Sequence, residues 1–157
     1  GGQQKGMRSG TENVPAYAGL GVAAEEIYTD FDKKTAHMYE LRDHFIESVQ
    51  RIEGVSVNGR TDHTNAPHVV SVSVDGVRAE VMLHTLEDRQ IYVSAGSACS
   101  SNKPAISSTL KSIGLKQSLL DSTIRFSFCV NTTQEEIDYA VTVMAEVIPM
   151  LRRYTRR

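Results

Sequence analysis

Hydrophobic positions change their period along the chain. In residues 13–28 and 30–54 they recur mostly every three or four positions, which predicts two helices. In residues 68–74 valines alternate with serines, the pattern of a strand with one buried face. Residues 1–12 are rich in glycine and polar side chains and are predicted to form a loop. Further strands are predicted at 55–57, 91–94 and 123–128, and further helices at 79–86, at 106–113 and from Thr133 onward.

This mixture of helices with a few strands predicts a two-layer α+β or α/β sandwich. With so few strands, we expect the helices to cover one face of the sheet. In the strand at 123–128, Ile124, Phe126 and Phe128 would point one way, and Arg125 would lie on the opposite, polar face.

The composition changes this picture little. Of 157 residues, 40% are hydrophobic and 23% charged, with a formal net charge of −2, as in an ordinary globular domain. Charges of both signs are interspersed, so we expect no binding to nucleic acid or to a membrane. The two cysteines make no disulfide framework, and the five histidines show no metal-ligand spacing, so no metal is expected. No leader or membrane-spanning stretch is present in the sequence, which favours a cytoplasmic location.

Cys99 is the first candidate for chemistry. It lies between Ala98 and Ser100 in a run of small residues that cannot pack a core, so its thiol is expected to be accessible. This context alone supports a working thiol and an incidental loop cysteine about equally. Cys129 follows a strand and is interpreted as a small core or strand-end residue.

Other features have both an ordinary and a chemical interpretation. Arg125 on the polar face of a strand is usually solvated, yet a guanidinium fork also matches a carboxylate. Residues 6–11 combine backbone amides with hydroxyls and an arginine that could bind phosphate, although most such stretches are ordinary loops. We interpret His37 and His44 as solvated, and His84 as partly buried.

Three motifs follow one another along the chain. They are GMRSGTEN at residues 6–13, YVSAGSACSS at 92–101, and IRFS at 124–127 followed by TTQEEID at 132–138. In this order they resemble the cysteine desulfurases of the class V aminotransferase superfamily, and the similarity covers essentially all 157 residues. The cysteine run is the most specific element, and it resembles the housekeeping and nitrogen-fixation branch of that family.

The resemblance implies a fold and a domain organisation. The fold would be the C-terminal small domain of a fold-type I pyridoxal-phosphate enzyme, an α+β two-layer sandwich with a small, mainly antiparallel sheet and helices packed on one face. Residues 13–157 would form this small domain, and residues 1–12 would be a loop at the end of a larger cofactor-binding domain.

The resemblance also implies roles for three residues. Cys99 would take sulfur from L-cysteine as a persulfide and leave L-alanine. Arg125 would hold the substrate carboxylate, and Thr11 would reach the phosphate of pyridoxal 5′-phosphate in the partner subunit of a homodimer. The sulfur would pass to acceptor proteins such as an iron–sulfur scaffold, or to tRNA thiolation.

The chain departs from the complete pattern of the family. No lysine lies in a context like that of the cofactor-forming lysine, which belongs to the larger N-terminal domain, so the chain alone is predicted to be inactive. The turn at residues 129–131 also differs from the expected one. Two alternatives stay open: a selenocysteine or cystine lyase of the same superfamily, and a sulfur-relay or scaffold-docking module without pyridoxal chemistry.

Overall fold

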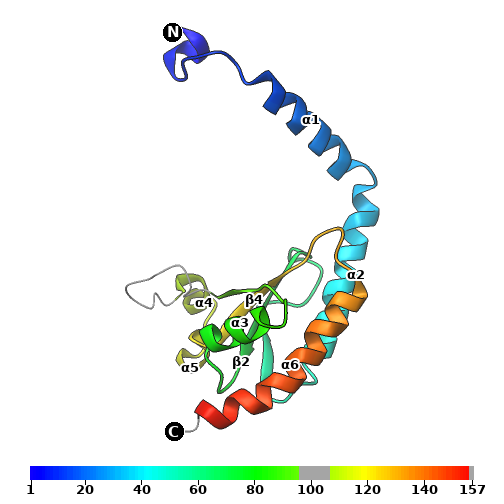
Figure 1. Ribbon diagram of the computed structural model, residues 1–157, viewed down its shortest axis with the longest axis vertical. Coiled ribbons are helices and arrows are strands. Elements are labelled where there is room, and N and C mark those ends of the chain that lie inside the picture. Colours follow the sequence, from blue (N-terminus) through cyan, green and yellow to red (C-terminus); the bar gives the residue numbers. More distant parts are fainter. Residues whose placement is uncertain (96–106, 156–157) are drawn as a thin grey trace. The chain divides into compact units, whose positions relative to one another are not determined.

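The computed structural model describes residues 1–95 and 107–155. The chain forms two compact units, Gly1–Lys34 and Thr35–Arg157, and each has its own internal organisation. Figure 1 shows the elements of both units. The predicted domain boundary after residue 12 concerns a larger protein and stays a prediction.

The first unit consists of a short 3₁₀ helix, η1 (Gln3–Gly6), and of α1 (Val14–Tyr28). Asn13 caps α1, because its side-chain oxygen accepts a hydrogen bond from the amide of Ala16 at 3.2 Å. The predicted loop at residues 1–12 is therefore interrupted by one helical turn. None of the residues of α1 is buried within the unit, although many of them are apolar.

The second unit contains a small antiparallel sheet, as predicted. In the described part of the chain its strands follow the order β1-β2-β4-β3. Val72 lies opposite Val57 on one side and opposite Ile124 on the other, so these three side chains share one apolar face. The bounds are β1 (Val55–Asn58), β2 (Val69–Val74), β3 (Ser94–Ala95) and β4 (Thr123–Ser127).

Three helices cover the apolar face of the sheet. They are α2 (Phe31–Val49), which begins in the first unit, α3 (Ala79–Glu87) and α6 (Gln134–Thr155). The fully buried ring of Phe45 from α2 lies 4.7 Å from the ring of Phe126. Side chains of α3 and α6 complete the same hydrophobic core, which confirms the α+β sandwich. The contributors from these two helices are Ala79, Met82, Leu86, Ile137, Val143, Met144, Val147 and Ile148.

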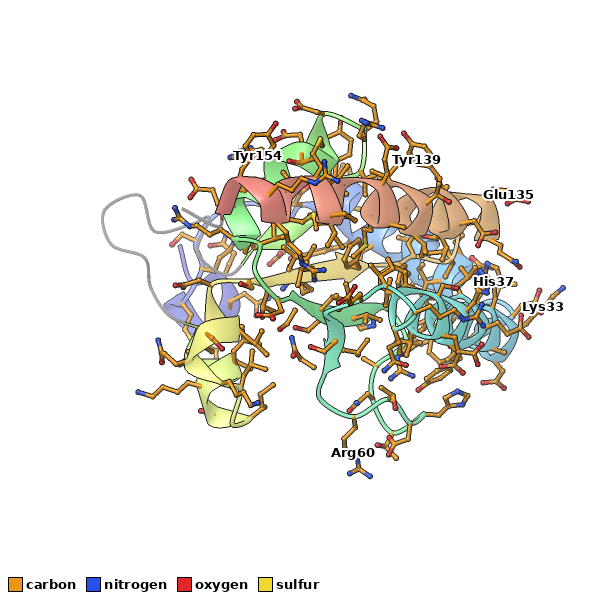
Figure 2. All side chains as sticks on the ribbon, turned by 90° about the horizontal axis from the view of Figure 1, so that it is seen from below. Lys33, His37, Arg60, Glu135, Tyr139 and Tyr154 are labelled. Carbon is orange, nitrogen blue, oxygen red and sulfur yellow. The ribbon has the colours of Figure 1, made fainter. Side chains whose placement is uncertain are left out.

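Figure 2 shows α6 along one side of the sheet, with Tyr139 pointing away from it, and the loop of Arg60 on the other side. The hydroxyl of Tyr139 donates a hydrogen bond to the carbonyl of Arg89 at 3.2 Å. The guanidinium of Arg89 in turn pairs with Glu146 at 2.8 Å. These contacts attach the end of α3 to the exposed side of α6.

The start of α6 agrees with the prediction that this helix begins at Thr133. The hydroxyl of Thr133 accepts a hydrogen bond from the amide of Glu136 at 3.3 Å. The carboxylate of Glu136 accepts one from the amide of Thr133 at 2.9 Å. This reciprocal pair is a capping box, which satisfies two amides that the helix itself leaves without partners.

The region around residues 91–120 differs from the prediction. A strand is expected at 91–94, but in the described part of the chain the residues that pair with β4 are Ser94 and Ala95, which form β3. The helix expected at 106–113 is the shorter α4 (Ser108–Ser112), and a further turn, α5 (Gln117–Leu120), was not predicted. A single helical turn is too short to produce a hydrophobic period.

Candidate functional site

The polar face of the sheet presents Arg125. In the antiparallel register, Arg125 of β4 lies opposite Ser71 of β2 and opposite Ser94 of β3. Residues that are directly opposite point to the same face, so these three polar side chains lie together. Arg125 is exposed, whereas Ile124 and Phe126 on either side of it are buried. The structure therefore places Arg125 where the alternation of the strand predicts it.

The guanidinium of Arg125 has spare hydrogen-bond capacity. Its Nη2 donates to Ser94 Oγ at 3.3 Å. The ion pairs formed among the described residues do not include Arg125. A guanidinium carries five N–H donors in a planar fork, so most of them are available to a further acceptor. A carboxylate or a phosphate can accept two hydrogen bonds from this fork.

A row of polar side chains runs across the same face. Asn58 Nδ2 donates to Ser71 Oγ at 3.1 Å and to Ser73 Oγ at 2.9 Å. Ser73 Oγ lies 2.7 Å from Thr123 Oγ1, which donates to the carbonyl of Leu119 at 2.8 Å. Ser73 is fully buried, so these bonds supply the partners that its hydroxyl needs. The sequence analysis missed this row, because its bonds join strands whose register the sequence does not give.

Thr11 lies in the first unit, in the loop between η1 and α1. It is exposed, and its carbonyl accepts a hydrogen bond from Arg8 Nη1 at 2.9 Å. Gly10 before it has a φ of 104°, which favours glycine at this position. Within the described residues the Thr11 hydroxyl has no hydrogen-bond partner, so it is free to bind one. Its proposed contact with a cofactor phosphate stays a prediction.

Cys99 lies at a position outside the described residues, in the segment 96–106. Its role as the nucleophile stays a prediction from the sequence. The segment follows β3 directly in the chain, and β3 pairs with the strand that carries Arg125.

Cys129 lies just beyond the end of a strand, which agrees with the second of its two interpretations, and it does not belong to the core. One residue, Phe128, separates it from β4, and the Cys129 side chain is exposed. Thr132 Oγ1 donates a hydrogen bond to its sulfur at 3.6 Å. This bond, followed by one from the backbone of Asn131, lowers the pKa of the Cys129 thiol, because both stabilise the thiolate. Cys129 is therefore a surface thiol that ionises more readily than an ordinary cysteine.

The structure places three of the histidines differently from the prediction. His37 Nε2 lies 3.1 Å from the carbonyl of Thr132, and His44 Nε2 lies 2.6 Å from Asp138, so both connect α2 to the α6 region and are not simply solvated. His84 was expected to be partly buried, but its side chain is 66% exposed.

Among the described residues, no three His, Cys, Asp or Glu side chains converge as metal ligands. In the same part of the chain no helix is long and apolar enough to cross a membrane.

That a pyridoxal-phosphate site needs residues from outside this chain stays a prediction. Such a site needs a lysine whose amine forms the covalent link to the cofactor. A cavity of about 600 Å³ opens between α6 and the turns that follow α2 and β2, but no lysine lines it. The Nζ of Lys34 donates to the carbonyl of Glu26. The other lysines of the described residues are exposed, namely Lys5, Lys33, Lys111 and Lys116.

Comparison with known proteins identifies the class of protein. The sequence model of the aminotransferase class-V family matches residues 2–140. The chain therefore belongs to the aminotransferase class-V family. Within it, the chain is similar to proteins that are named cysteine desulfurases and to NifS-like proteins, as the three motifs indicated.

Two curated relatives show the extent of the similarity. The cysteine desulfurase IscS of Rickettsia prowazekii is 39% identical over 154 residues, which cover 98% of this chain and 37% of that protein. The NifS/IcsS protein homolog of Lactobacillus delbrueckii subsp. bulgaricus is 35% identical over 147 residues, 94% of this chain and 38% of that protein. The chain thus spans less than two fifths of the length of these relatives.

Solved structures agree with this assignment. A NifS-like protein superposes with a TM-score of 0.82 at 28% identity, over 96% of this chain and 38% of its own. The apo cysteine desulfurase of Thermococcus onnurineus NA1 superposes with a TM-score of 0.73 at 25% identity, over 94% of this chain and 34% of its own. The fold expected from the motifs is confirmed.

Proposed function

We propose that this chain is part of a cysteine desulfurase that converts L-cysteine to L-alanine. The observation that carries the proposal is Arg125, an exposed guanidinium on the polar face of the sheet that pairs with no carboxylate of the described residues. Its fork suits the α-carboxylate of an amino acid substrate. We propose L-cysteine as this substrate because relatives of the chain are named cysteine desulfurases.

Cys99 is proposed to receive the sulfur. Its thiolate attacks the sulfur atom of L-cysteine, so that a new S–S bond forms while the C–S bond of the substrate breaks. The electron pair stays with the substrate carbon, which takes up a proton and becomes L-alanine. The sulfur remains on Cys99 as a persulfide, from which a thiolate of an acceptor protein removes it. An iron–sulfur scaffold and the tRNA thiolation route are the acceptors that we propose.

The remaining parts of the site are assigned to the complete protein. Pyridoxal 5′-phosphate would supply the electron sink for C–S cleavage when the complete protein binds it. In the described part of the chain no lysine is placed to hold it, so we expect the chain alone to be inactive. The exposed hydroxyl of Thr11 would contact its phosphate across a homodimer. Residues 1–12 would then be the last residues of the large domain, and residues 13–157 would form the small domain. The enzyme would work in the cytoplasm.

The test is sulfide release from L-cysteine under reducing conditions. The samples are the complete gene product, its Cys99→Ala and Arg125→Ala variants, and the chain 1–157. Cys99→Ala should abolish release. Arg125→Ala should lower kcat/KM about a hundredfold or more, because it removes two charge-assisted hydrogen bonds to the substrate. The chain 1–157 alone should release no sulfide.

Arg60→Ala is the matched control, since Arg60 is also an exposed arginine but pairs with Asp62 at 2.9 Å. Its activity should equal that of the wild type. Activity that survives Cys99→Ala would contradict the persulfide role and favour a lyase, which a comparison of rates on selenocysteine and cysteine would then identify. Sulfide release by the chain alone would contradict the proposal that its activity needs the rest of the protein.

A further inference from the structure

Among the described residues, the guanidinium of Arg125 is hydrogen-bonded from one neighbouring strand, β3. Ser71 and Ser94 both lie opposite Arg125 in the sheet, on the two neighbouring strands. Ser94 Oγ accepts a hydrogen bond from Arg125 Nη2 at 3.3 Å. Ser71 Oγ instead accepts its hydrogen bond from Asn58 Nδ2 at 3.1 Å. The two serines that lie opposite Arg125 therefore have different hydrogen-bond donors, Asn58 for Ser71 and Arg125 for Ser94.

We propose that Ser94 is a positioning residue that sets the orientation of the Arg125 guanidinium for a substrate carboxylate. The proposal rests on the proposed function, in which Arg125 binds the carboxylate of L-cysteine. An exposed arginine has many rotamers, and ordering it costs conformational entropy each time that a ligand binds. A hydrogen bond at one Nη restricts the planar fork before the substrate arrives, so less entropy is lost on binding.

The sheet does not need the Ser94 hydroxyl for its own structure. β3 is held to β4 by backbone pairing at Ser94 and Ala95, and this pairing is independent of the side chain. The side chain is only half-buried, so its removal leaves no buried group without a partner. The hydroxyl oxygen has two lone pairs, and it keeps its own proton when it accepts from Arg125. The contact to Arg125 is thus the specific contribution of this side chain.

The test compares Ser94→Ala, Ser94→Thr and Ser71→Ala in the complete gene product. Ser94→Ala should raise the KM for L-cysteine about three- to tenfold, the loss expected for one hydrogen bond, with kcat within about twofold of the wild type. Ser94→Thr keeps the hydroxyl and suits a strand, so it should restore the wild-type KM. Ser71→Ala should leave KM unchanged. Inhibition by cysteamine, which lacks the carboxylate, should be equal in all four proteins.

An unchanged KM in Ser94→Ala, or an equal rise in Ser71→Ala, would overturn the proposal. A second measurement keeps it separate from the proposed function. The NMR order parameter of the Arg125 side chain, assigned with Arg125→Lys, should fall in Ser94→Ala and recover in Ser94→Thr. If the wild type releases no sulfide, the proposed function fails. The order parameter of Arg125 then tests the positioning role by itself, and an unchanged value in Ser94→Ala overturns that role.

Discussion

Replacing Gly54 by alanine tests how the end of α6 is attached to the sheet. Gly54 joins α2 to β1 with a φ of 69°, a conformation that alanine adopts only with strain. A Cβ at this position would overlap Nη2 of Arg152 and lie 3.1 Å from its Cζ. Arg152 is placed there by its Nε, which donates a hydrogen bond to the carbonyl of Asp75 at 2.9 Å. The substitution therefore strains the backbone and also displaces a side chain.

Gly59 separates the two effects, because its φ is 83° but a Cβ there would meet nothing within 4 Å. In Gly59→Ala only the backbone strain acts, about 1–2 kcal/mol, offset by about 0.4–1 kcal/mol because alanine makes the unfolded chain less flexible. Gly54→Ala should cost about 1 kcal/mol more, the value of the bond from Arg152 to Asp75. The excess stays small because Arg152 Nη2, buried without a partner among the described residues, regains water when it moves.

The assay is urea unfolding of each variant, followed by circular dichroism. The decisive comparison is a double-mutant cycle: in an Arg152→Ala background, the cost of Gly54→Ala should fall to that of Gly59→Ala. An equal cost of Gly54→Ala in both backgrounds would refute the role of Arg152. An equal cost of the two glycine substitutions in the wild-type background would refute the proposed overlap.

Two further predictions concern the core and the surface thiol. Phe45→Ala should destabilise the chain by about 3–5 kcal/mol in the same urea assay, because the side chain is fully buried against two other rings, whereas Tyr154→Ala at a 79% exposed position should change stability little. Cys129 should be alkylated by iodoacetamide with a pH midpoint below that of a free cysteine, because its lowered pKa gives thiolate at lower pH. Thr132→Val should move this midpoint up, as peptide mass spectrometry can show; an unmoved midpoint would contradict the role of the Thr132 hydroxyl.

Much of the second unit could be predicted because its signals are local. The alternation of residues 68–74 predicts β2 and its buried face, since both depend only on a period of two. Thr133 and Glu136 predict the start of α6, because a capping box involves residues three apart. The helix prediction for α2 succeeds for the same reason: Phe45 and Val49 are one turn apart, and both are fully buried.

The failures lie where structure depends on distant partners. Among the described residues β3 pairs with β4 at Ser94 and Ala95, whereas the apolar residues 91–93 that predicted the strand do not pair with it. For the candidate site, strand alternation predicts the face on which Arg125 lies. The hydrogen bond to Ser94 could not be predicted, because it depends on the register of β3 against β4.

The polar face of the sheet divides into two parts with different physical roles. At Ser73 and Thr123 the hydroxyls are buried and bonded to one another, so this part needs internal partners to be stable. At Arg125 the guanidinium is exposed and bonded only to Ser94 among the described residues, so this part keeps donors for a molecule from outside the unit. A fold needs no exposed arginine at this place, since surface charges contribute little to stability. The proposed recognition of an anionic group by Arg125 uses these free donors, and the proposed function therefore depends on this residue.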